Sequence, residues 1–205
     1  MVGGKLFIVG TPIGNLKDIT LRAIEVSKEV DYILCEDTRV TGKLLNSYGI
    51  AKKMVTFNDF SEQAKTPDII KDLLIGHVVA LVSDAGTPLI SDPGFKLVRE
   101  CIHQGIAVES IPGPSSIITA LTLSGLPPDK FIFVGYLPKK DGKRKRFLDD
   151  LKKSREIVKL TVIAFESPFR LLKTLEDIKN VFGEIDVVIC RELTKMYEEI
   201  KREKV

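Results

Sequence analysis

Apolar, β-branched runs alternate with amphipathic segments through the first half of the chain, and the connections between them are short. The runs have the length and composition of buried strands, whereas the segments between them carry apolar residues at helical spacing. The predicted strands are residues 5–10, 31–35, 54–57, 78–82 and 107–111, and the predicted helices are residues 20–30, 38–48, 61–75 and 93–104. This alternation restricts the N-terminal half to an α/β fold, a doubly wound parallel sheet with helices on both faces.

Glycines and prolines mark the predicted helix boundaries. A glycine directly follows each of three helices, at Gly49, Gly76 and Gly105. Asp92 followed by Pro93 is typical of a helix start, because a carboxylate caps the first amides and proline tolerates the first turn. Ser167 and Pro168 repeat this pattern before another predicted helix. We therefore expect Asp92 and Ser167 to be N-caps.

A stiff segment separates two domains. Its sequence, Ile111-Pro-Gly-Pro-Ser-Ser116, combines two prolines with a glycine, which is typical of an extended connector. We predict an N-terminal α/β domain over residues 1–111, a hinge over 112–116 and a C-terminal α/β domain over 117–205. The elements expected after the hinge are helices at 116–124, 143–154 and 168–182, strands at 131–135, 159–165 and 185–191 in a mixed sheet, and a charged helix at 194–205.

Cysteine, histidine and hydropathy patterns exclude several classes of site. Three widely separated cysteines match no zinc or disulfide spacing, which favours reduced core thiols in a cytoplasmic protein. They are Cys35, Cys101 and Cys190. With only two histidines, we expect no metal site. The longest uncharged stretch, residues 110–128, contains four prolines, so we expect no membrane span.

Unusual sequence follows four of the five N-terminal strands at the point where each strand ends. These loops are residues 10–15, 36–39, 83–88 and 112–116. The carboxyl ends of parallel strands meet at one edge of a sheet, where ligands bind. Each loop alone also fits an ordinary turn, and Asp84 also fits an Asx-turn. Because connections at the opposite edge, such as Lys52–Lys53, are plain, the convergence of four loops predicts a ligand site.

The loops lack the patterns of several common sites. No Walker phosphate loop occurs, and Pro12 stands where a dinucleotide-binding loop has its middle glycine. A serine nucleophile would have no histidine partner, because His77 and His103 lie away from this edge. Carboxylates, hydroxyls and backbone remain, which suits a small organic cofactor bound by shape and hydrogen bonds.

A basic segment lies in the second half of the chain. Residues 139–146 contain six basic side chains. Four of them fall at the start of a predicted helix: Lys143, Arg144, Lys145 and Arg146. The helix dipole disfavours cations there by roughly a few tenths of a kcal/mol each. Residues 113–205 hold 19 basic and 14 acidic side chains, whereas residues 1–112 hold 12 and 14. We therefore favour a contact with a nucleic-acid phosphate backbone over the alternative, a solvated surface segment.

Six parts of the sequence carry a family resemblance. They are Val9–Leu16 with Asp18–Thr20, Glu36–Arg39, Leu81–Gly94, Ile111–Ser115, Phe165–Arg170 and Arg191–Lys195. Together they cover nearly the whole chain in order, and they resemble the tetrapyrrole-methylase-like superfamily of S-adenosylmethionine-dependent methyltransferases. Within it they are most similar to bacterial enzymes that methylate the 2′-hydroxyl of a cytidine in small-subunit ribosomal RNA.

The resemblance implies a two-domain tetrapyrrole methylase-like fold, with S-adenosyl-L-methionine in a cleft between the domains, and a homodimer. Carried over by position, the cofactor contacts come from Pro12 or Ile13 and from Asp84, Thr87, Ser115, Ser116 and Phe165. Family members usually continue past Thr194–Lys195 with a further strand. An incomplete C-terminal sheet is therefore one alternative for this chain.

The implied reaction is attack of a ribose 2′-hydroxyl on the methyl group of a sulfonium, which depends on alignment and on a nearby base. The resemblance leaves four weak catalytic candidates: Asn15, Glu36, Asp37 and Glu166. Arg39 and Arg170 are candidates for orienting ribose or phosphate. For these residues a network of salt bridges between the loops is an equally open alternative.

The predicted partner is small-subunit ribosomal RNA, either naked or in an assembled small ribosomal subunit, and no membrane is expected. One alternative is a methyltransferase of the same fold that acts on a tetrapyrrole or a protein side chain. A second is a non-catalytic RNA-binding protein. The basic segment 139–146 favours RNA as the substrate.

Overall fold

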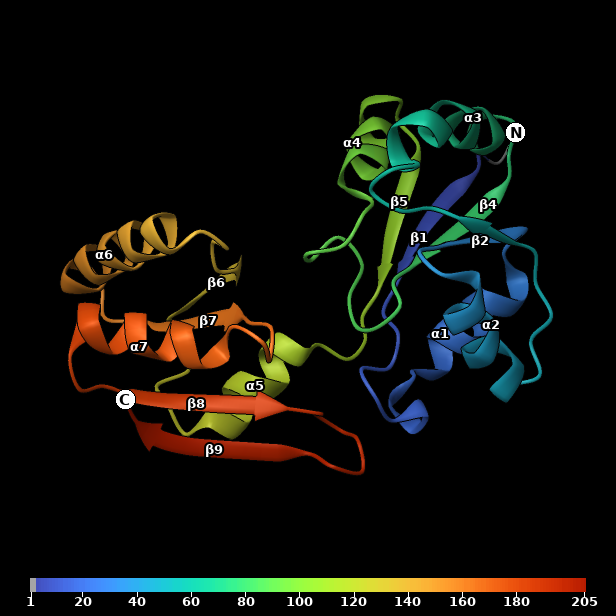
Figure 1. The fold of residues 1–205 in the computed structure, drawn as a ribbon. Coiled ribbons are helices and arrows are strands. Elements are labelled where there is room, and N and C mark those ends of the chain that lie inside the picture. Colours follow the sequence, from blue (N-terminus) through green and yellow to red (C-terminus); the bar gives the residue numbers. More distant parts are fainter. Residues whose placement is uncertain (1–2) are drawn as a thin grey trace. The chain divides into compact units, whose positions relative to one another are not determined.

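The computed structural model describes residues 3–205 of the chain (Figure 1). The chain divides into two compact units, Met1–Ser116 and Ile117–Val205. This division falls at the end of the predicted connector. The hinge function of residues 112–116 stays a prediction.

A five-stranded parallel sheet forms the centre of the N-terminal unit. Its strands are β1 (Lys5–Val9), β2 (Tyr32–Cys35), β3 (Met54–Thr56), β4 (Val78–Val82) and β5 (Ala107–Ile111). They lie in the order β3-β2-β4-β1-β5, and every pair is parallel. β1 therefore lies between β4 and β5. Strands buried on both faces need apolar residues at every position, which explains the near-continuous apolar runs.

Helices cover both faces of this sheet, as Figure 1 shows. They are α1 (Leu21–Glu29), α2 (Thr38–Ser47), α3 (Glu62–Leu74) and α4 (Phe95–His103), with a short 3₁₀ helix, η1 (Leu16–Asp18). One core cluster joins the sheet to α1 and α2 through Ala23 and Leu45. A second joins it to α3 and α4 through Leu73 and Leu97. The predicted doubly wound α/β fold is thus confirmed.

The start of α4 differs from the prediction. Gly94 is the N-cap, with φ at 125°, and no side chain of its own caps the helix. Glu62 provides the cap instead: its Oε1 accepts hydrogen bonds from the amides of Gly94, at 3.1 Å, and Lys96, at 3.0 Å. Glu62 is buried. The assignment of Asp92 as the N-cap was wrong, because the helix begins later and a carboxylate from α3 already binds its amides.

The C-terminal unit contains a parallel and an antiparallel strand pair. Its elements are α5 (Ser116–Ser124), β6 (Phe131–Tyr136), α6 (Asp141–Ile157), β7 (Thr161–Phe165), α7 (Leu171–Phe182), β8 (Asp186–Arg191) and β9 (Glu199–Lys204). β6 pairs with β7 in parallel, and β8 pairs with β9 in antiparallel. Leu137, Leu148 and Leu151 form the centre of its core. Both strand directions occur in this α/β unit, but they lie in two separate two-stranded sheets and not in the one mixed sheet that was predicted. Among the helices of residues 3–205, none could cross a membrane.

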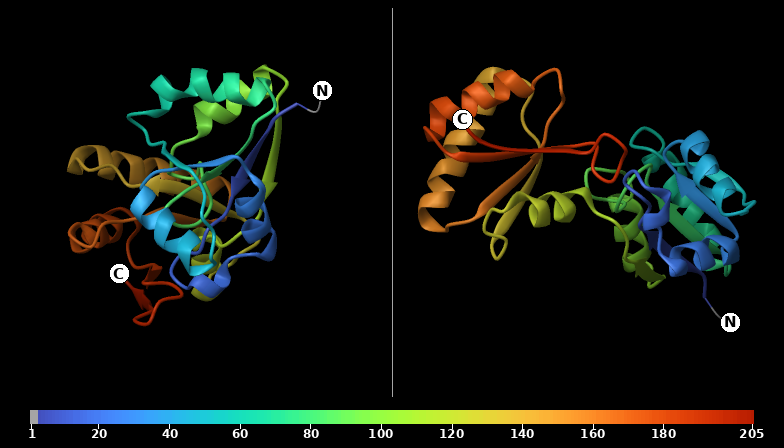
Figure 2. Two further views of the ribbon diagram at one scale, coloured as in Figure 1. Left: turned by 90° about the vertical axis from the view of Figure 1, so that its right-hand side faces the viewer. Right: turned by 90° about the horizontal axis from the view of Figure 1, so that it is seen from below.

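Two local expectations for this unit were wrong. The tail that we expected to be helical contains strand β9, which forms a long pair with β8 (Figure 2). Arg202 of β9 donates hydrogen bonds to the carbonyls of Ser124, at 3.2 Å, and Leu123. Helix α7 has Arg170 at its N-cap position without a side-chain cap, so Ser167 does not cap it.

Candidate functional site

The loops after β1 and β4 are joined at the carboxyl edge of the N-terminal sheet. Thr11 and Gly86 exchange backbone hydrogen bonds of 2.9 and 3.1 Å, and the Thr11 hydroxyl donates to the carbonyl of Ser83 at 3.1 Å. β1 and β4 are neighbours, yet their loops lead to helices on opposite faces of the sheet. Such a divergence is the switch point at which doubly wound sheets bind ligands.

The loops after β1 and β5 touch backbone to backbone. A Cβ on Gly10 would lie 2.8 Å from the Cα of Gly113, and a Cβ on Gly113 would lie 2.9 Å from the Cα of Gly10. The amide of Gly10 also donates to the carbonyl of Ile111, at 3.1 Å. Both positions therefore need glycine, since real side chains do not approach backbone so closely. The close contact fixes the connector against the first loop.

Gly86 is needed for a different reason. Its φ is 88°, a left-handed conformation that side chains rarely adopt. A Cβ there would lie 3.4 Å from the Cγ2 of Ile13. The hydroxyl of the next residue, Thr87, donates to the carbonyl of Pro114, at 3.4 Å. The loop after β4 thus contacts both the first loop and the connector.

The loop after β2 joins the same edge through Asp84. The backbone amide of Asp37 donates to Oδ1 of Asp84, at 3.2 Å. Burial and the charges of Asp92 and Asp84 raise the pKa of Glu36, and a hydrogen bond from the Asp84 backbone lowers it by a smaller amount. The Asp84 residue as a whole is exposed, although partial desolvation of its carboxylate raises its pKa. All four predicted loops therefore meet at one edge of the sheet.

Glu36 has the pKa of a group that can exchange protons near neutral pH. Burial and the negative charges of Asp92 and Asp84 raise the pKa of Glu36 to about 7. Glu36 is half-buried and belongs to none of the ion pairs among residues 3–205. Its carboxylate can therefore accept a proton at neutral pH.

Asp37 has the opposite character. Its carboxylate accepts hydrogen bonds from Arg39 Nη2 at 2.6 Å and Arg39 Nε at 3.0 and 3.1 Å, and its Oδ1 caps α2 by binding the Arg39 amide at 2.8 Å. These hydrogen bonds lower the pKa of Asp37 to about 2. A carboxylate of that pKa is a poor proton acceptor. Arg39 is held within its own loop, although its side chain is exposed.

The remaining N-terminal candidates lie around this edge with different exposure. Asn15 is exposed, and its side chain caps η1 by accepting the Lys17 amide at 3.1 Å. Pro12 is buried and Ile13 is half-buried. Ser115 and Ser116 are half-buried at the start of α5.

Asp92 is a member of this edge that the sequence did not indicate. Its pKa is raised by burial and by the charges of Asp84 and Asp59, whereas a hydrogen bond with Ser83 lowers it. Asp92 thus adds negative charge beside Glu36 instead of capping α4. Its place in the same loop as Asp84 was the only available signal.

In the C-terminal unit, Glu166 and Arg170 bind each other. Their Oε1 and Nη2 atoms are 2.5 Å apart. Glu166 also accepts hydrogen bonds from the Thr174 hydroxyl, at 2.7 Å, and the Ser167 amide, at 2.6 Å. Arg170 further donates to the carbonyl of Leu137, at 3.1 Å. For Glu166 and Arg170 the structure therefore shows an ion pair, as in the alternative of a salt-bridge network. The pair lies within one loop and does not connect two loops.

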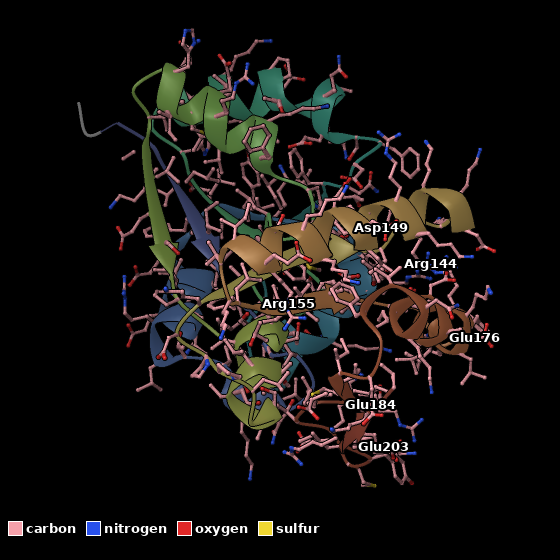
Figure 3. The ribbon with its side chains drawn as sticks, turned by 90° about the vertical axis from the view of Figure 1, so that its left-hand side faces the viewer. Arg144, Asp149, Arg155, Glu176, Glu184 and Glu203 are labelled. Carbon is pink, nitrogen blue, oxygen red and sulfur yellow. The ribbon has the colours of Figure 1, made fainter. Side chains whose placement is uncertain are left out.

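Arg144 was predicted to contact RNA, and the structure contradicts this. Arg144 is 1% exposed. Its guanidinium donates to Asp177 Oδ2 on α7, at 2.7 and 2.9 Å, to Asp141 at 2.8 Å, and to the carbonyls of Pro138 and Lys139 at 3.3 Å. Figure 3 labels Arg144 on α6, beside α7. It links the two helices, so it is not available to a ligand.

The other three cations at positions 143–146 are exposed: Lys143, Lys145 and Arg146. Lys145 Nζ lies 3.9 Å from Asp177 Oδ1, and that oxygen is buried without a hydrogen-bond partner among the described residues. Phe165 is half-buried and packs against Phe133 and Tyr136. Its predicted contact with the cofactor stays a prediction.

Comparison with known families and sequences finds relatives over nearly the whole chain. Residues 5–205 match the family described as Tetrapyrrole (Corrin/Porphyrin) Methylases. Ribosomal RNA small subunit methyltransferase I of Thermotoga maritima is 51% identical, over 98% of this chain and 89% of the relative. The protein of the same name from Escherichia coli O157:H7 is 50% identical, over 96% of this chain and 68% of the relative.

Solved structures share the fold at lower sequence identity. Diphthine synthase aligns with a TM-score of 0.74 and 17% identity, over 98% of this chain and 81% of that chain. Cobalt precorrin-4 methyltransferase, a cobalamin biosynthetic enzyme, aligns with a TM-score of 0.69 and 20% identity, over 97% of this chain and 84% of that chain. These likenesses concern the fold alone.

Proposed function

The chain belongs to the tetrapyrrole methylase family, whose methyl donor is S-adenosylmethionine, and we propose that it methylates the 2′-hydroxyl of a cytidine in small-subunit ribosomal RNA. The observation that carries this proposal is the identity of about half of all residues with relatives named for methylation of small-subunit ribosomal RNA. The relatives' names give RNA as the substrate; the 2′-hydroxyl and the cytidine are our proposal.

RNA is favoured over a tetrapyrrole or a protein side chain by two features. The relatives that share half of the residues are RNA methyltransferases by name, whereas the enzymes that act on other substrates share a fifth or less. Lys143, Lys145 and Arg146 also present exposed positive charge to a phosphate backbone.

The edge of the N-terminal sheet fits a cationic cofactor. S-adenosylmethionine carries its methyl group on a positively charged sulfonium, and this sulfonium is the source of the transferred methyl. The carboxylates of Glu36, Asp84 and Asp92 give the edge a negative charge that complements it. We assign Asp84 to accept hydrogen bonds from the cofactor, because it is exposed and held by the Asp37 amide. Pro12 or Ile13, Thr87, Ser115 and Ser116 complete the proposed contacts from this unit.

Glu36 is the best candidate for the base that removes the proton from the 2′-hydroxyl. A base is most effective when its pKa lies near the working pH, which matches the pKa of about 7 at Glu36. The alternatives are occupied: Asp37 by Arg39, and Glu166 by Arg170 and Thr174. Positioning the hydroxyl and the methyl group in line supplies most of the remaining rate acceleration.

Methyl transfer in vitro tests this function. The purified full chain is incubated with S-adenosylmethionine carrying a labelled methyl group, and with either naked small-subunit RNA or assembled small subunits. We expect label in RNA from at least one arm, and 2′-O-methylcytidine after digestion to nucleosides. Sedimentation of the same sample tests the proposed homodimer. Absence of S-adenosylmethionine binding in calorimetry would instead favour a non-catalytic RNA-binding protein.

A further inference from the structure

Aromatic side chains gather at the carboxyl ends of β6 and β7. The rings of Tyr136 and Phe165 have centroids 5.5 Å apart, and those of Phe133 and Phe165 are 4.9 Å apart, edge to face. Tyr136 is 63% exposed although it packs on this cluster. Phe169, in the loop after β7, is fully exposed. Exposed apolar patches on a protein surface often mark sites at which another molecule binds.

A β-bulge places Tyr136 beside Phe165. Phe133 pairs with Ile163 and Tyr136 pairs with Phe165, so β6 has one more residue than β7 over this interval. Gly135 accommodates the extra residue with φ at 64°. Bulges of this kind re-aim a side chain and are common next to functional sites.

The loops that carry these aromatic residues are tied together. Arg170 donates to the carbonyl of Leu137, and Arg144 donates to the carbonyls of Pro138 and Lys139. The loop between β6 and α6 is therefore held from both sides by buried or half-buried guanidinium groups. Exposed Lys139 and Lys140 follow directly in this loop. We call Tyr136, Phe169, Lys139 and Lys140 the aromatic–basic edge.

Exposed aromatic rings beside cations form the surface on which single-stranded nucleic acid binds, because bases stack on the rings while cations contact the phosphates. We propose that Tyr136 and Phe169 stack on unpaired bases of the RNA substrate, and that Lys139 and Lys140 contact the adjoining phosphates. This inference rests on the proposed function and adds the form of the substrate: the segment that enters is single-stranded.

A second copy of the chain fits this edge less well. A symmetric contact centred on this edge would bring the lysines of both copies together near the two-fold axis, and like charges repel. An RNA strand supplies the opposite charge.

Binding of a labelled oligocytidylate, measured by fluorescence anisotropy at low salt, tests the aromatic–basic edge. We expect Tyr136→Ala and Phe169→Ala each to weaken binding by about 5- to 150-fold, the range that base stacking on an aromatic side chain supplies. Tyr136→Phe should bind like the unaltered chain. The matched control is Phe131→Ala, which removes an exposed aromatic side chain from the amino end of the same strand.

Salt dependence separates stacking from charge. The slope of log affinity against log salt concentration is negative, and its magnitude should decrease by about 0.7 for Lys139→Ala and for Lys140→Ala, the contribution of one phosphate contact with a single strand. It should stay unchanged for Tyr136→Ala. The chain contains four tyrosines and no tryptophan, so its intrinsic fluorescence comes from tyrosine. Oligonucleotide should quench this fluorescence less in Tyr136→Phe than in the unaltered chain.

The outcomes separate this inference from the proposed function. Unchanged oligonucleotide affinity in Tyr136→Ala and Phe169→Ala, with thermal unfolding as in the unaltered chain, overturns the inference even if the unaltered chain methylates ribosomal RNA. If these two variants change the sedimentation coefficient but not the RNA affinity, the inference is also overturned, because the edge would then be a contact between two copies of the chain. Lost affinity in these variants, with no methyl transfer by the unaltered chain, supports the edge and contradicts the proposed function.

Discussion

The backbone amide of Asp37 binds Oδ1 of Asp84 at 3.2 Å, and this hydrogen bond joins two loops that are 47 residues apart in the sequence. It holds an exposed carboxylate at the switch point of the sheet, beside the contact of Gly10 with Gly113. The candidate cofactor site is thus assembled from loops that fix one another before a ligand binds. Such preorganisation lowers the entropic cost of binding.

Asp84→Ala is expected to weaken S-adenosylmethionine binding by about 10- to 150-fold, since hydrogen bonds to a charged group contribute about 1.5–3 kcal/mol. Isothermal titration calorimetry measures this directly. The matched control is Asp68→Ala, because Asp68 is an exposed carboxylate on α3 that pairs only with Lys71 among the described residues. Equal affinities in the two variants would remove Asp84 from the cofactor site.

Glu36→Gln is expected to lower kcat by about 10²- to 10⁴-fold while S-adenosylmethionine still binds, because the amide cannot accept the proton. In the unaltered enzyme, kcat/KM should rise with pH and level off above about 7, where Glu36 is deprotonated. Asp37→Asn is the comparison: the pKa of Asp37 is about 2, so its loss should leave the pH profile near 7 in place. A Glu36→Gln enzyme with the original pH profile would exclude Glu36 as the base.

Glu36 should also make folding stability depend on pH. Its pKa is raised from an ordinary 4.5 to about 7, so the folded state binds the proton more tightly than the unfolded state. The stability that this adds is present below pH 4.5 and is lost as the pH rises to about 7. Glu36→Gln should therefore be more stable than the unaltered chain at about pH 8, by urea unfolding, and not at about pH 4. A variant that loses stability at pH 8 would contradict the assigned pKa.

Glu62→Ala is expected to lower the free energy of unfolding by about 1–3 kcal/mol, because two amides at the start of α4 lose their acceptor. Asp92→Ala should cost less than Glu62→Ala, since Asp92 does not cap α4 and loses only its hydrogen bond with Ser83. Chemical denaturation of both variants checks the assignment. A larger loss in Asp92→Ala would return Asp92 to the role of the cap.

Arg144→Ala is expected to destabilise the chain by about 3–5 kcal/mol, since it leaves the buried carboxylate of Asp177 without its ion pair. Lys143→Ala, on the next residue, should change stability by no more than about 0.5 kcal/mol and should weaken RNA binding. If instead Arg144→Ala unfolds like the unaltered chain and loses RNA affinity, Arg144 is a ligand contact.

The sheet and the meeting of its loops at one edge could be predicted because both depend on local patterns. Buried parallel strands are continuous apolar runs, and the carboxyl ends of such strands share one edge whatever the helices contribute. Close contacts such as that of Gly10 with Gly113 explain the glycines in these loops, although the sequence does not indicate which residues they touch.

Long-range partners explain the predictions that were wrong. The cap of α4 comes from Glu62, 32 residues before Gly94, so the local Asp92-Pro93 pattern was misleading. Residues 199–204 contain five charged side chains of types that favour helices, yet pairing with β8 makes the segment a strand. In the run of cations at 143–146, only the position of α7 distinguishes buried Arg144 from its exposed neighbours.

Mass mapping of small-subunit ribosomal RNA, from cells with and without the gene, tests the central claim most directly. We predict that cells without the gene lose the methyl group from the 2′-hydroxyl of one cytidine, and that the gene restores it whereas its Glu36→Gln form does not. Identical maps, or the loss of a methyl group from a base instead of a ribose, would contradict the account.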